Sequence, residues 1–250
     1  MRKILSVILS AFVLVTCFTG CGGANEAASS GENSSELISS EKEPYTMDGK
    51  IFIFLGSSVT YGSASGGRSF ADLIGERNNC TAIKLAVSGT TLVDNSASSY
   101  VARLKNESAN YPVCDHLIVQ LSTNDATGNK PLGVMTDSMD INSFDTSTVI
   151  GAIEYIIAFA KNKWNCKVSF YTGTKYDSAA YKNMVDALLE IQKKWGIGVL
   201  DLYNDPEMNA VSPSDYNKYM SDPIHPTLKG YEEWWLPKFE EFILAEGNKE

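Results

Sequence analysis

The sequence has little of what a metal site or a nucleic-acid surface needs. Only two histidines are present, His116 and His225, and there is no Cys-x-x-Cys pair, so we expect no metal. Basic residues number 21 against 30 acidic ones, which gives a formal net charge of −9. A surface this acidic repels phosphate backbones and anionic membranes, which argues against a nucleic-acid partner. After residue 20, no apolar run approaches the ~18 residues that a membrane-spanning helix needs.

The first residues have the pattern of an export signal. Arg2 and Lys3 precede the apolar run Ile4–Phe18, which is too short for a typical spanning helix. The tripeptide Thr19-Gly20-Cys21 that follows resembles the bacterial lipobox, whose cysteine is acylated and becomes the new N-terminus. The alternative is that Cys21 is an ordinary thiol near a peptidase cut. We expect a lipoprotein signal peptide over residues 1–20 and lipidation at Cys21.

Residues 21–46 are rich in serine and glutamate and poor in large apolar side chains. Such a segment cannot bury enough surface to offset its ordering entropy, so it predicts a flexible tether. The lipid alone would then anchor the protein to the cell membrane, on the extracytoplasmic side. Removal of the two basic residues of the signal lowers the net charge to −11.

Residues 47–250 are enough for one sizeable domain. Five short, nearly continuous apolar runs recur in it: Ile51–Leu55, Ala82–Val87, His116–Leu121, Lys167–Thr172 and Ile197–Leu202. Such runs are typical of strands buried on both faces of a parallel sheet. Stretches with helical spacing lie between them, and Pro237 is expected to kink the last helix. This alternation predicts a three-layer α/β domain with right-handed crossovers.

Polar motifs follow the expected strands. The first three runs are followed by Gly56-Ser57-Ser58, Ser88-Gly89-Thr90 and Ser122-Thr123-Asn124, and Asp222-Pro223-Ile224-His225 comes beyond the fifth. Because ligands of open parallel sheets bind beyond the carboxyl ends of the strands, we expect these motifs to converge on one edge. None of them is a phosphate-binding glycine loop, so no nucleotide cofactor is expected.

These residue types suit acyl transfer through a serine. The Ser58 hydroxyl can attack a carbonyl carbon if His225 takes its proton, and Asp222 can hold the far nitrogen of the imidazole. The backbone N–H groups of Ser58 and Gly89 and the carboxamide of Asn124 are candidate donors to the oxyanion. We expect Asp125 to have a structural role and His116 to lie at the opposite end of the sheet.

The order Ser, Gly, Asn and Asp-x-x-His resembles the SGNH hydrolases, also called GDSL esterases and lipases, over about residues 50–245. The resemblance implies a flavodoxin-like α/β/α sandwich with a five-stranded parallel sheet of order 2-1-3-4-5. It also implies a Ser58-His225-Asp222 triad and an oxyanion hole formed by Ser58, Gly89 and Asn124. Ser57 stands where the family usually has aspartate, and alignment on the following Val59-Thr60 favours Ser58 as the nucleophile.

The leading hypothesis is a serine esterase that removes O-acetyl or other short acyl groups from carbohydrate without a cofactor. One alternative is a lysophospholipase or thioesterase acting on lipids, and another is a solute-binding lipoprotein without catalysis. The loop 203–221, which carries Tyr203, Tyr216, Tyr219 and Met220, is either an ordinary surface loop or a wall that faces a sugar.

Cys80, Cys114 and Cys166 remain once Cys17 leaves with the signal and Cys21 takes a lipid. Each stands just before an expected strand. In the order 2-1-3-4-5 the strands after Cys114 and Cys166 are neighbours, about 4.7–4.9 Å apart. If one disulfide forms, we expect it to join these two and to leave Cys80 free; three buried thiols are the alternative.

Overall fold

The computed structural model describes residues 43–249, which form one parallel sheet of five strands surrounded by helices. The strand order is β2-β1-β3-β4-β5. The bounds are β1 Ile51–Gly56, β2 Thr81–Ala86, β3 His116–Gln120, β4 Lys167–Tyr171 and β5 Gly198–Leu200. The predicted α/β fold and the order 2-1-3-4-5 are confirmed. The expected signal peptide, the expected lipidation site Cys21 and most of the expected tether fall within residues 1–42, outside the described residues.

Helical segments connect and flank the strands. Their bounds are α1 Ser58–Tyr61, η1 Ser63–Ser65, α2 Phe70–Asn78, α3 Tyr100–Glu107, η2 Ser108–Asn110, α4 Thr123–Thr127, η3 Ile141–Ser143, α5 Val149–Trp164, α6 Ala179–Trp195, α7 Pro213–Tyr219, α8 Leu228–Gly230, η4 Tyr231–Trp235 and α9 Leu236–Asn248. The two longest begin at a hydroxyl cap, Thr148 for α5 and Ser178 for α6, and end at the left-handed residues Asn165 and Gly196.

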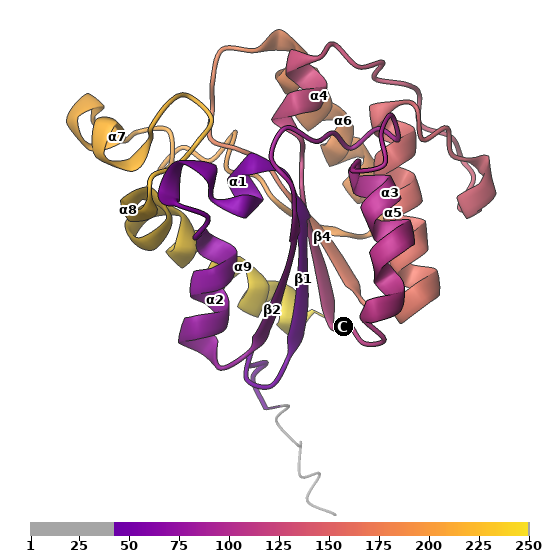
Figure 1. Cartoon of the computed structure of the whole chain (residues 1–250), viewed down its shortest axis with the longest axis horizontal. Coiled ribbons are helices and arrows are strands. Elements are labelled where there is room, and N and C mark those ends of the chain that lie inside the picture. The colour runs from indigo at the N-terminus through magenta and orange to yellow at the C-terminus, as the bar shows by residue number, and fades with distance from the viewer. Residues whose placement is uncertain (1–42, 250) are drawn as a thin grey trace, which may run out of the picture. The chain divides into compact units, whose positions relative to one another are not determined.

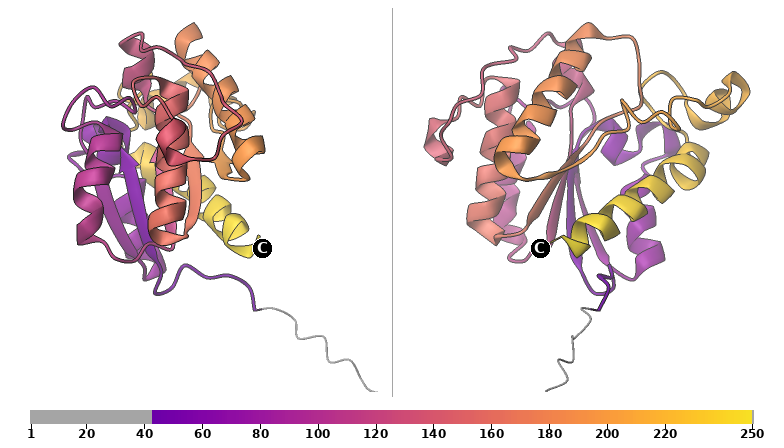
Figure 2. Two further views of the ribbon diagram at one scale, coloured as in Figure 1. Left: turned by 90° about the vertical axis from the view of Figure 1, so that its right-hand side faces the viewer. Right: turned by 180° about the vertical axis from the view of Figure 1, so that it is seen from behind.

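The helices cover both faces of the sheet, as Figure 1 and the turned views of Figure 2 show. Along β1 the side chains alternate between two cores: Ile53 and Leu55 pack with α3, α5 and α6, whereas Phe52 and Phe54 pack with α2, η4 and α9. These side chains are fully buried on both faces, which explains why the strand reads as a continuous apolar run.

The last helix differs from its expected form. In place of a single kinked helix, α8 leads into the π-helical turn η4, which continues into α9. Pro237 is the second residue of α9, which directly follows the π-helical turn. Because it has no N–H and its ring clashes with the carbonyl four residues earlier, it cannot continue a regular α-helical turn. The irregularity therefore lies in the π turn before the proline.

The N-terminal edge of the packed domain lies slightly before the expected boundary at residue 47. The Tyr45 N–H donates to Asn248 Oδ1 at 2.8 Å, and Met47 is buried. Within the range 43–249, no helix combines the length and apolar character needed to cross a membrane.

Candidate active site

The turn after β1 separates two adjacent serines. Gly56 must lack a side chain, because a Cβ there would lie 1.7 Å from Thr60 Oγ1. Ser57 is fully buried, and its N–H donates to Gln120 Oε1 at 2.9 Å. Ser58 begins α1 and keeps 8% of its surface exposed. The turn thus hides the first hydroxyl and presents the second to the edge of the sheet.

The Ser58 hydroxyl contacts one ring nitrogen of His225, and the other ring nitrogen contacts the Asp222 carboxylate. Ser58 Oγ lies 2.8 Å from His225 Nε2, and His225 Nδ1 lies 2.7 Å from Asp222 Oδ2. The His225 side chain is 26% exposed and the Asp222 side chain 49%, so both side chains are accessible to solvent. The structure therefore joins the predicted serine, histidine and aspartate in one chain of hydrogen bonds.

The loop that carries the imidazole is held in place by hydrogen bonds within the loop itself. Asp222 Oδ1 accepts from the N–H groups of Ile224 at 2.8 Å and His225 at 2.9 Å, and Met220 bridges to Pro226. Partial burial raises the pKa of Asp222, but these amides and the imidazole outweigh it and lower that pKa overall. The carboxylate is thus kept ionised beside the His225 imidazole.

The three predicted oxyanion donors lie on the segments that follow β1, β2 and β3. In the described part of the chain, the N–H groups of Ser58 and Gly89 donate to no other protein group. Gly89 has φ of +78°, a conformation that favours glycine. The Asn124 Nδ2 donates to the Thr90 carbonyl at 2.9 Å. Since a carboxamide nitrogen carries two hydrogens, one remains for a ligand.

Asp125 supports this edge from inside the protein. It is fully buried, and its carboxylate accepts from the N–H groups of Leu92 at 2.7 Å and Val93 at 3.2 Å. Burial raises the pKa of Asp125, against which these hydrogen bonds act. The side chain therefore ties the loop beyond Gly89 to α4, in agreement with its expected structural role.

The sequence matches the GDSL-like Lipase/Acylhydrolase family over residues 54–233, which contain every one of these segments. The chain belongs to this family. No curated protein matches the chain.

Solved structures share the fold of this GDSL-like hydrolase at low identity. A protein from Lactobacillus plantarum is 20% identical, with a TM-score of 0.66, and the match covers 79% of this chain and 98% of that one. A protein described as a GDSL-like lipase from Bacteroides ovatus is 16% identical (TM-score 0.57), with 79% and 97% covered. A family two carbohydrate esterase from Clostridium thermocellum, in complex with cellohexaose, is 14% identical (TM-score 0.53), with 81% and 64% covered.

Gln120 is a site residue of this GDSL-like hydrolase that the sequence analysis missed. Its Oε1 accepts from the N–H groups of Ser57 and Thr60 and from Thr60 Oγ1, at 2.9, 3.2 and 2.8 Å. One side chain at the end of β3 therefore fixes the whole turn that carries Ser58. The available signal was a polar residue that ends an otherwise apolar strand.

Two hollows share Thr174 in their lining, and neither is lined by Ser58, Asp222 or His225. The smaller hollow is a slot with room for about 10 Å³. Its lining includes Thr174 and also Val59, Thr123 and Ile224, which are the sequence neighbours of Ser58, Asn124 and His225. Thr174 also lines a cavity of about 430 Å³, whose other lining residues are Lys175, Met208, Asn209, Val211, Pro213, Tyr216, Asn217 and Trp234.

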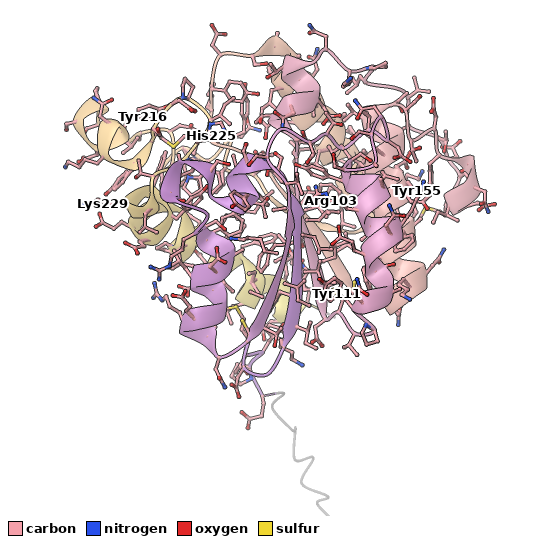
Figure 3. The ribbon with its side chains drawn as sticks, in the orientation of Figure 1. Arg103, Tyr111, Tyr155, Tyr216, His225 and Lys229 are labelled. Carbon is pink, nitrogen blue, oxygen red and sulfur yellow. The ribbon has the colours of Figure 1, made fainter. Side chains whose placement is uncertain are left out.

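The large side chains of residues 203–221 lie in two environments, the protein interior and this cavity. Tyr203 and Met220 are buried, and Tyr219 stacks on Trp234 with ring centroids 5.6 Å apart. Tyr216 lines the cavity; burial and the nearby charge of Asp222 raise its pKa. Figure 3 labels Tyr216 and His225 on the same side of the molecule.

His116 lies at the other end of the sheet, where β3 begins. Its Nε2 lies 2.8 Å from Ser169 Oγ, and burial lowers its pKa to about 3. Among residues 43–249, no three His, Cys, Asp or Glu side chains gather in a way that could hold a metal ion.

Proposed function

We propose that this protein is a serine esterase that hydrolyses O-acetyl or other short acyl esters on carbohydrate. The observation that carries the proposal is the uninterrupted contact from Ser58 Oγ through the His225 imidazole to Asp222, at 2.8 and 2.7 Å. A binding protein has no need of this arrangement, so the non-catalytic alternative is disfavoured.

In the proposed reaction Ser58 Oγ attacks the carbonyl carbon of the ester and gives its proton to His225 Nε2. The carbonyl oxygen becomes an oxyanion, held by the N–H groups of Ser58 and Gly89 and by Asn124 Nδ2. The bond to the alcohol oxygen then breaks, and the alcohol leaves with the proton from His225. Water attacks the acyl-enzyme by the same steps, which releases the acid and restores Ser58.

The small slot supports a short acyl group. Its free volume of about 10 Å³ is at the lower limit for one water molecule, so a long acyl chain does not fit there without rearrangement. The lipid alternative predicts long-chain preference. The rates of hydrolysis of p-nitrophenyl acetate and p-nitrophenyl decanoate distinguish the short-acyl and lipid hypotheses. We expect a higher kcat/KM on the acetate. A higher kcat/KM on the decanoate would favour a lipid substrate.

The larger cavity supports carbohydrate as the alcohol part. It adjoins the slot at Thr174 and combines the aromatic rings of Tyr216 and Trp234 with amides and a lysine. Aromatic faces beside polar groups suit a pyranose ring, and a structural relative, the family two carbohydrate esterase, is complexed with cellohexaose.

Substitutions at Tyr216 test the carbohydrate assignment. Tyr216→Ala should lower kcat/KM on acetylated oligosaccharides about 10-fold, and leave hydrolysis of p-nitrophenyl acetate nearly unchanged, because the small ester does not reach the cavity. Tyr216→Phe keeps the ring and should retain most activity on both. An equal loss on both substrates, or none on either, would argue against a sugar site there.

We also propose that Cys21 carries a lipid that anchors the enzyme outside the cytoplasm. The supporting pattern is Thr19-Gly20-Cys21 behind a charged start and a short apolar run. Expression of the full chain in a bacterium fed an alkyne-labelled fatty acid should label the wild type and not Cys21→Ser. Equal labelling, or none in either protein, would exclude Cys21 as the anchor.

A further inference from the structure

Arg103 is a charged side chain buried between α3 and the sheet, where Figure 3 labels it beside β1. It is 4% exposed. The guanidinium makes four hydrogen bonds, and every acceptor is uncharged: the carbonyls of Ser98 at 3.0 Å, Leu85 at 2.6 Å and Gly56 at 2.7 Å, and Thr90 Oγ1 at 3.2 Å. The planar fork of the side chain thus reaches several separate segments at once.

No carboxylate in the described part of the chain forms an ion pair with Arg103. The ring of Tyr100 has its centroid 5.2 Å from the guanidinium carbon, and the charge of Glu107 acts on Arg103 without forming an ion pair with it. Burial lowers the pKa of Arg103, although an arginine remains protonated at any working pH. A buried cation without a carboxylate opposes folding, so its presence calls for a benefit other than stability.

Two of the four acceptors of Arg103, the Gly56 carbonyl and the Thr90 hydroxyl, lie on segments of the candidate active site. Gly56 stands two residues before Ser58, and Thr90 directly follows Gly89. The Thr90 carbonyl in turn accepts from the Asn124 carboxamide at 2.9 Å. A single guanidinium therefore connects the segments that carry all three candidate oxyanion donors.

We propose that Arg103 is the electrostatic positioning residue of the oxyanion hole. Its hydrogen bonds hold the Gly56 and Thr90 segments at the spacing that the donors require. Its positive charge, which is buried and forms no ion pair among residues 43–249, stabilises the negative charge that develops on the carbonyl oxygen. The inference rests on the proposed esterase function and concerns the transition state, whatever the acyl group or alcohol.

The test compares Arg103→Met, which removes the charge, with Arg103→Lys, which keeps it. Both are assayed on p-nitrophenyl acetate, with competent enzyme counted by fluorophosphonate titration. Arg103→Met should lower kcat about 10- to 100-fold, less than or equal to the loss of a direct donor, with KM changed no more than about 2-fold. Arg103→Lys should recover part of the loss.

A boronic acid supplies a readout that a purely structural role would not move. It forms a tetrahedral, negatively charged adduct with Ser58, so its inhibition constant should weaken in Arg103→Met by about the same factor as kcat. Lys194→Met is the matched control, since Lys194 is another poorly exposed cation, paired with Glu154 on the α5–α6 side. It should lower thermal stability and leave kcat and boronate inhibition unchanged.

If Arg103→Met does not fold, Thr90→Val decides, because it removes one acceptor of the guanidinium and keeps the charge. It should lower kcat at constant KM, and Thr90→Ser should rescue it. The inference would be overturned, and the proposed function left intact, if Arg103→Met kept the wild-type kcat and boronate inhibition per competent site. If Arg103→Met does not fold, the same result for Thr90→Val would overturn it. A wild-type protein without ester hydrolysis would overturn the proposed function and the inference with it.

Discussion

Ser58 and His225 are 167 residues apart in the chain, yet Ser58 Oγ and His225 Nε2 lie 2.8 Å apart. Two independent local structures produce this contact. Gln120 fixes the turn that presents Ser58, and the Asp222 carboxylate binds the backbone of the loop that presents His225. Both partners are therefore positioned before a substrate arrives, which limits the rearrangement needed for catalysis.

Asn124 is expected to act in the transition state. Asn124→Ala should lower kcat about 10²-fold with little change in KM, by comparison with other oxyanion donors. Steady-state kinetics on p-nitrophenyl acetate provide the measurement. A large rise in KM at unchanged kcat would make Asn124 a substrate-binding group instead.

The activity should fall as the pH is lowered, through a single protonation. A protonated His225 cannot accept the Ser58 proton, whereas Asp222 stays ionised because its pKa is lowered. The acid limb of a plot of kcat/KM against pH should therefore have unit slope. Incubation with EDTA should leave the rate unchanged. Loss of activity in EDTA that a divalent ion restores would contradict this mechanism.

The buried His116 should make the folded protein sensitive to acid. Its pKa is lowered to about 3 in the folded state, against about 6.5 in an unfolded chain. Between these values the unfolded state binds the additional proton, so the free energy of unfolding falls as the pH falls from about 6.5 towards 3. His116→Gln should show a shallower dependence over this range in urea unfolding. An unchanged slope would show that His116 is not buried neutral.

The cysteines give a test of the strand order in solution. Cys114 and Cys166 stand just before the neighbouring strands β3 and β4, where each thiol shifts the pKa of the other, and both are free in this structure. Cys80 lies apart, and burial raises its pKa, which makes its thiol less reactive. Oxidised glutathione, which takes up the two electrons, should produce a Cys114–Cys166 disulfide and leave Cys80 free. Non-reducing peptide mapping decides, and a bridge that contains Cys80 would contradict the arrangement.

The strands and the site motifs could be predicted because each signal is local. Apolar runs such as Ile51–Leu55 are buried on both sides, and the polar groups that follow them necessarily meet at one edge. The strand predictions are wrong only at the ends of the strands. For example, the run Ile197–Leu202 predicts a strand over its whole length, but β5 covers only Gly198–Leu200, because the flanking residues do not pair with β4.

The roles of Gln120 and Arg103 could not be predicted, because they depend on contacts across the fold. Gln120 binds a turn 60 and 63 residues away, and Arg103 binds carbonyls 18 and 47 residues away. Similarly, the sequence of residues 203–221 does not distinguish the buried Tyr203 from Tyr216, which lies on helix α7 and lines the cavity.

The most direct test of the account is fluorophosphonate labelling followed by peptide mass spectrometry, because the reagent reacts only with an activated serine. The wild type and Ser57→Ala should both carry one label on Ser58, since Ser57 is fully buried and does not contact the imidazole. Ser58→Ala should carry none and should not hydrolyse p-nitrophenyl acetate. An unlabelled wild type, or a Ser58→Ala protein that is still labelled and active, would contradict the assignment of Ser58 as the nucleophile.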